Sequence, residues 1–81
     1  MADVPAPELT PELRSLFHRL NNQLGIILAH AELLEAKAST EMERTRAGYV
    51  VTSVLDAMTT TGLIRREAEQ AASAVVGNAN L

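Results

Sequence analysis

The sequence predicts an all-α fold: an antiparallel helical hairpin that homodimerises into a four-helix bundle. Two long stretches, residues 13–38 and 47–71, repeat apolar side chains every three or four residues, and no proline interrupts them. The 81-residue chain is too short to bury enough surface by itself. It has no cysteine, and its two histidines lie far apart, so disulfides and a structural metal are excluded as staples. A second copy is the remaining way to complete the core.

The first helix is expected from about residue 11 to residue 37. Residues 1–9 hold two of the three prolines and show no periodicity, which is typical of a flexible tail. Thr10, Pro11 and Glu12 then have the pattern of an N-cap, a first-turn proline and an acid at the positive end of the helix dipole. The apolar seam of this helix is Leu13, Phe17, Leu20, Leu24, Ile27, Ala31, Leu34 and Ala38, with Leu16, Leu28 and Leu33 beside it.

The second helix is expected from about residue 41 to residue 76. Thr40 and Glu43 have the spacing of a capping box. Gly77 and Asn78 are candidate stop signals, so residues 77–81 are expected to fray, and residues 10–76 form the hairpin domain. The seam of this helix is Ala47, Val50, Val54, Ala57, Thr61, Ile64, Ala68 and Ala71, with Val51, Leu55 and Met58 alongside.

The composition limits the kinds of partner and the cellular compartment that we expect for this protein. The net charge of -3 argues against a nucleic-acid or anionic-membrane surface. The chain shows no signal peptide and no apolar run of membrane-spanning length, so we expect a cytoplasmic protein that binds neither membrane nor nucleic acid. No cofactor motif is present in the sequence.

His18 lies on an unusual face of the first helix. If Phe17 turns into the core, the neighbours of His18 at helical spacing are Arg14, Ser15, Asn21, Asn22 and Gly25, all polar or small. Antiparallel pairing brings residues 59–62 of the second helix, Thr-Thr-Thr-Gly, to the same level, and both stretches are weak helix formers. His30 falls on a different face and is expected to be a surface residue, so a two-histidine metal site is not predicted. A lone exposed histidine is usually incidental, and the combined features are what favour function.

The segment from residue 17 to residue 35 reads FHRLNNQLGIILAHAELLE. It resembles the phosphoacceptor segment, or H-box, of the dimerisation and histidine-phosphotransfer domain of bacterial sensor histidine kinases. The likeness rests on the histidine, the Asn-Asn pair, the following leucine and the Glu-Leu-Leu stretch, and it extends more weakly to the second helix.

The resemblance implies a homodimeric bundle acting in a two-component phosphorelay. His18 would accept a phosphoryl group and exchange it with an aspartate of a response-regulator receiver domain, and Asn22 would orient a water or otherwise support the reaction. Arg14, Arg19, Asn21 and Gly25 would contact the docked partner. A separate histidine kinase is the other partner that the resemblance implies.

Two departures limit the resemblance. Arg19 stands where the family usually has an acid that accepts a hydrogen bond from the histidine ring, and the sequence contains no nucleotide-binding motif. An autonomous histidine kinase is therefore not expected, and a phosphotransferase remains open. The alternative is a non-catalytic dimerisation or adaptor module that binds a receiver or kinase without phosphorylation. Monomeric histidine-phosphotransfer proteins match less well, because two helices are too few for their fold.

Overall fold

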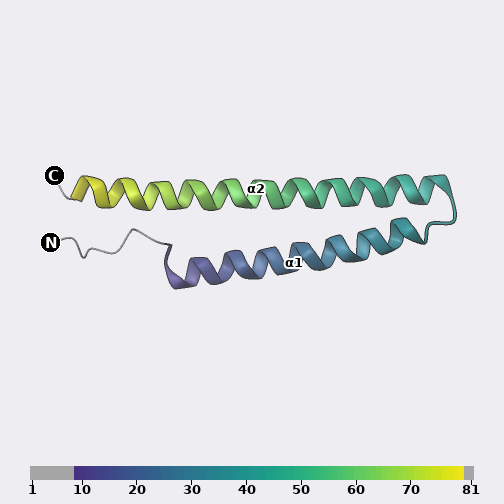
Figure 1. Ribbon diagram of the computed structural model, residues 1–81, viewed down its shortest axis with the longest axis horizontal. Helices are drawn as coiled ribbons and strands as arrows, with labels where there is room; N and C mark the ends of the chain where they lie inside the picture. Colours follow the sequence, from purple (N-terminus) through teal and green to yellow (C-terminus); the bar gives the residue numbers. More distant parts are fainter. Residues whose placement is uncertain (1–8, 80–81) are drawn as a thin grey trace.

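The computed structural model describes residues 9–79, which form two helices and no strand. Helix α1 spans Pro11–Ala36 and helix α2 spans Glu41–Ala79. The helices lie side by side and antiparallel, joined by a tight turn at one end (Figure 1). The resulting rod measures 64 × 17 × 16 Å. The predicted all-α hairpin is thus confirmed for this part of the chain.

Helix α1 begins where the sequence predicts. The hydroxyl oxygen of Thr10 accepts a hydrogen bond from the backbone N–H of Leu13 at 3.1 Å, and Pro11 occupies the first turn. Residues 1–8 of the expected tail lie outside the described residues. Leu9, also assigned to that tail, is buried with 7% of its surface exposed, because the apolar side chain before the cap packs onto the hairpin. The packed chain therefore starts before the N-cap.

The turn between the helices occupies residues 37–40, and α1 ends one residue earlier than expected. The N–H of Lys37 donates to the carbonyl of Leu33 at 3.0 Å and closes α1. The hydroxyl of Thr40 accepts from the N–H of Glu43 at 3.1 Å, as a capping box requires. The carboxylate of Glu43 accepts instead from the N–H of Ser39 at 3.3 Å, one residue before the cap. A connection this short forces the helices to pack as antiparallel neighbours.

Helix α2 continues beyond the predicted stop at residue 76. Gly77 and Asn78 lie inside the helix, which ends at Ala79, and residues 80–81 fall outside the description. A glycine ends a helix when its backbone turns left-handed, and no described residue has a positive φ. The prediction of a C-terminal stop at Gly77 was therefore wrong: this glycine lowers helix propensity without terminating the helix.

One half of each predicted seam forms the contact between the helices. On α1 this row contains Phe17, Leu24 and Ala31, spaced seven residues apart. On α2 it contains Ala47, Val54 and Thr61, which are all buried. The hydroxyl of Thr61 donates to the carbonyl of Ala57 at 2.8 Å, so this buried polar group is satisfied. We call these six residues the contact rows.

The other half of each seam is exposed. Three residues after each member of the contact rows comes another apolar side chain, and we call this set the apolar face: Leu20, Ile27, Leu34, Val50, Ala57 and Ile64. The exposed fraction rises from 39% at Leu20 to 66% at Leu34, and Ala57 alone is half-buried. A two-helix hairpin offers each helix a single neighbour, so it covers only one of its two apolar rows.

Candidate functional site

His18 occupies an exposed position on α1, directly after the buried Phe17. One residue corresponds to about 100° of rotation round an α-helix, so a buried Phe17 turns the next side chain away from the contact with α2. Within residues 9–79 the imidazole makes no hydrogen bond or ion pair. The imidazole of His18 is thus open to an incoming group.

Equivalent positions on the two helices share a side of the hairpin. Because α1 and α2 run in opposite directions, the same step along each sequence turns both side chains toward the same side. Leu34 and Val50, each three residues after a contact-row residue, line one hollow together. The positions one residue after the contact rows must therefore share the other side. They include His18, Gly25, Leu55 and Gly62, which we call the histidine face.

The histidine face contains two glycines that the hairpin itself does not require. A Cβ atom added to Gly25 or Gly62 would meet no atom within 4 Å, and neither glycine has a positive φ. In contrast, a Cβ atom on Gly48 would approach a carboxylate oxygen of Glu35 at 3.1 Å. Each glycine in a helix interior costs about 1 kcal/mol relative to alanine. Gly25 and Gly62 therefore lower helix propensity on this face without relieving a close contact inside the hairpin.

The part of helix α1 that holds His18 has no Asp or Glu between Glu12 and Glu32. Arg14 lies one turn before His18, and Arg66 lies one turn after Gly62 on the same side of α2. Both arginines are exposed, and the neighbouring Arg65 is held near Glu69, with Nε and Oε2 at 3.7 Å. The charged side chains of α1 nearest to His18 in the sequence are thus both basic, Arg14 and Arg19, although the whole chain carries -3.

The structure gathers most of the predicted site residues but not all of them. Asn22 is exposed one turn after His18, and Asn21 is exposed between it and the contact row. Arg19 is exposed but turns away, because it lies a further 100° round α1, on the side most distant from α2. Sequence reasoning missed Leu55, an exposed apolar side chain of α2 on the histidine face. Its position one residue after Val54, matching His18 after Phe17, is the signal that could have found it.

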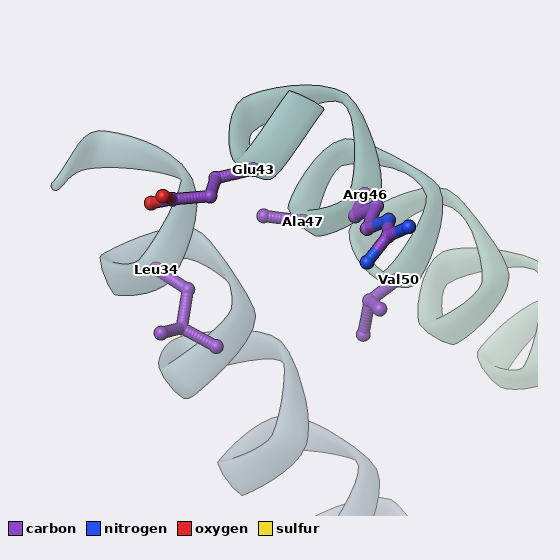
Figure 2. A pocket seen from close by; sticks show the side chains of 5 residues that line it. All are labelled: Leu34, Glu43, Arg46, Ala47 and Val50. Carbon is purple, nitrogen blue, oxygen red and sulfur yellow. The ribbon is translucent and has the colours of Figure 1, made fainter. Parts of the chain in front are cut away.

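A hollow of about 290 Å³ interrupts the apolar face near the turn. It is lined by Leu34, Glu43, Arg46, Ala47 and Val50. Figure 2 shows the side chain of Leu34 extending from α1 and that of Ala47 from α2 toward the same space. The hollow opens on the side of the hairpin opposite His18, so the apolar face is uncovered there as well.

Other kinds of site are not found in residues 9–79. This part of the chain contains no group of three or more His, Cys, Asp or Glu side chains arranged to hold a metal. His30 is an exposed residue of α1, as the sequence predicts. Neither described helix combines the length and apolar character needed to cross a membrane. No protein-family model matches the chain, and no curated protein or solved structure is detectably similar to it.

Proposed function

We propose that this chain is a homodimeric histidine-phosphotransfer protein, in which His18 accepts a phosphoryl group and exchanges it with an aspartate of a response-regulator receiver domain. The observation that carries the proposal is the opposite placement of two faces on one hairpin. His18 is exposed beside glycines on one side. Ile27 comes nine residues later, two and a half turns, and therefore points to the other side with the rest of the apolar face.

The apolar face supports the homodimer. Soluble proteins rarely expose a contiguous apolar stripe along their whole length. Here the stripe follows both helices at bundle spacing, and the positions beside it include the neutral residues Gln23, Ser53 and Thr60. A two-fold axis would pack the apolar faces of two hairpins together and form a four-helix core. His18 would remain on the outside of that bundle.

The histidine face supports phosphotransfer. An exposed imidazole has a nitrogen lone pair available for attack on phosphorus and stores the group as a phosphoramidate. The amide of Asn22, one turn away, supplies both a donor and an acceptor for a water or a phosphoryl oxygen. Gly25 and Gly62 leave room for the backbone of a docking domain, and the exposed Leu55 offers it an apolar contact.

The second candidate is a non-catalytic adaptor with the same dimer and the same docking face. Arg19 favours it, because a guanidinium cannot accept a hydrogen bond from the imidazole. The exposed apolar side chains of Ile26 and Leu33, which lie on neither defined face, also favour a binding role.

Phosphoryl labelling separates the two candidates. The protein would be incubated with a panel of radiolabelled phosphorylated receiver domains and with kinase catalytic domains plus labelled ATP. We expect label that is stable in alkali and lost in acid, as phosphohistidine is. His18→Ala should abolish the label, and His30→Ala, the matched exposed histidine of α1, should keep it. Receiver binding without label from any donor would establish the adaptor instead.

Sedimentation velocity tests the dimer independently. We expect a particle of twice the 8.7 kDa chain mass at micromolar concentration. A folded monomer at that concentration would overturn the homodimer, whatever the labelling shows.

A further inference from the structure

We infer a second interaction surface on this protein: the outer edge of α1 binds the outer edge of α2 in another copy of the chain, so that neighbouring molecules associate side by side. The inference goes beyond the proposed function and requires no chemistry at His18. It follows from complementary side chains on two rows that belong to neither the apolar face nor the histidine face.

Each helix has a row of side chains that points away from the other helix. A position two residues after a contact-row residue lies about 200° further round the helix, so its side chain is directed outward. We call these positions the outer rows: Arg19, Ile26 and Leu33 on α1, and Tyr49, Asp56 and Leu63 on α2, with Met42 one step of seven residues before Tyr49. On each helix the outer row lies about 100° from the apolar face and from the histidine face. A dimer formed through the apolar faces therefore leaves the outer rows uncovered.

Both outer rows expose large apolar side chains. Ile26 and Leu33 on α1, and Met42, Tyr49 and Leu63 on α2, each have more than half of their surface exposed in the hairpin. Exposed apolar side chains that line up in a row, and that are not scattered singly, are typical of a surface that binds another protein.

The outer rows carry opposite charges. Arg19 is exposed on α1 and Asp56 is exposed on α2, and neither forms an ion pair within residues 9–79. Between residues 19 and 33, the outer row of α1 and the positions three and four residues after its members contain no acid. Between residues 49 and 63, the same positions of α2 contain no Lys or Arg. Two α1 edges or two α2 edges would bring like charges together, so the charges favour α1 of one copy against α2 of another.

One antiparallel alignment matches the two outer rows over three successive steps of seven residues. It pairs Arg19 with Asp56, Ile26 with Tyr49, and Leu33 with Met42. The parallel alignment through the same ion pair provides a single apolar pair, Ile26 with Leu63. We therefore assign the antiparallel alignment, in which two apolar pairs follow one ion pair.

This contact uses a different edge of the hairpin in each copy. The second copy contributes its α2 edge and keeps its α1 edge free for a third, so the contact is heterologous and can repeat. The interface is one helix edge on another and therefore small, so we expect association at about 0.1–1 mM and not at micromolar concentration.

Sedimentation velocity over a concentration series tests the outer rows. We expect the weight-average sedimentation coefficient of the unmodified protein to rise between about 0.1 and 1 mM, and to rise less in about 0.5 M salt, which screens the ion pair. Arg19→Asp and Asp56→Arg should each lower the association constant about tenfold, because each replaces an attraction by a repulsion. The double variant should restore association, since the reversed pair forms again between copies. Arg66→Asp, with the same change of charge at an exposed position outside the outer rows, is the matched control and should keep most of the association.

Ile26→Glu tests the apolar part of the contact. It should abolish association at about 1 mM, because it places a carboxylate where the outer row of α2 is apolar and acidic. The dimer at micromolar concentration should remain, since Ile26 lies outside the apolar face.

Two results would overturn the inference. One is a sedimentation coefficient that stays at its micromolar value up to about 1 mM. The other is association that both single charge variants leave intact, or that the double variant fails to restore although circular dichroism shows it to be folded. Neither result affects the homodimer, which is measured at micromolar concentration, or the labelling of His18.

Discussion

The two sides of this hairpin are built from the same helices, yet they differ sharply in composition. The apolar face repeats aliphatic side chains at every step, from Leu20 to Leu34 on α1 and from Val50 to Ile64 on α2. The histidine face has two glycines, Gly25 and Gly62, at such positions and carries the exposed His18. The apolar face has the composition of a surface that a partner buries. The histidine face has the composition of a surface that stays exposed to solvent.

The two faces also differ in what each costs the protein: the histidine face lowers helix propensity, and the apolar face exposes hydrophobic surface. Glycine lowers helix propensity at Gly25 and Gly62 without relieving any close contact inside the hairpin. Large aliphatic side chains on the apolar face keep between 39% and 66% of their surface exposed, which lowers the solubility of a single hairpin. Under the proposed function, a second copy would cover the apolar face, and a transiently bound domain would dock on the histidine face.

The largest expected effect comes from a charge on the apolar face. Ile27→Glu should cost about 3–5 kcal/mol per chain, because the dimer would bury an unpaired carboxylate. The matched control is Ile26→Glu. Ile26 is more exposed in the hairpin than Ile27, 60% against 47%, and it lies outside the apolar face. Sedimentation and thermal unfolding by circular dichroism would measure both. If Ile27→Glu and Ile26→Glu sedimented and unfolded alike, the apolar face would be no more important for stability than the rest of the surface.

The next effect concerns the contact rows. Leu24→Ala should lower the free energy of unfolding by about 2–5 kcal/mol, because Leu24 lies between the buried levels of Phe17 and Ala31. Leu33→Ala removes the same atoms from an exposed site and serves as the control. Urea unfolding would measure the difference. A change below about 0.5 kcal/mol at Leu24 would mean that the contact row is misplaced.

The smallest effect concerns the glycines of the histidine face. Gly25→Ala and Gly62→Ala should each stabilise the protein by about 1 kcal/mol, because a Cβ atom meets open space at both positions. Gly48→Ala should gain less, since its Cβ would approach Glu35. If the glycines admit a docking domain, the same two variants should slow transfer to His18. If the two variants are stabilised but transfer the phosphoryl group at an unchanged rate, Gly25 and Gly62 have no role in docking.

Local features of the fold were predictable from the sequence. The Thr10 cap, the Pro11 start and the Thr40 cap depend on neighbouring residues only, and the structure contains all of them. The exposure of His18 followed from the burial of Phe17 next to it. The end of α2 was not predictable in the same way, because Gly77 allows both a left-handed stop and a continuing helix.

The sequence by itself therefore determined two amphipathic helices, their starting points and the exposure of His18. Only the tertiary structure decided which half of each apolar seam faces the other helix. Phe17 and Leu20, or Val54 and Ala57, fit the same bundle periodicity equally well, so the pattern alone does not choose between them. The short turn fixes the rotation of α1 against α2, and that rotation buries one row and leaves the other exposed.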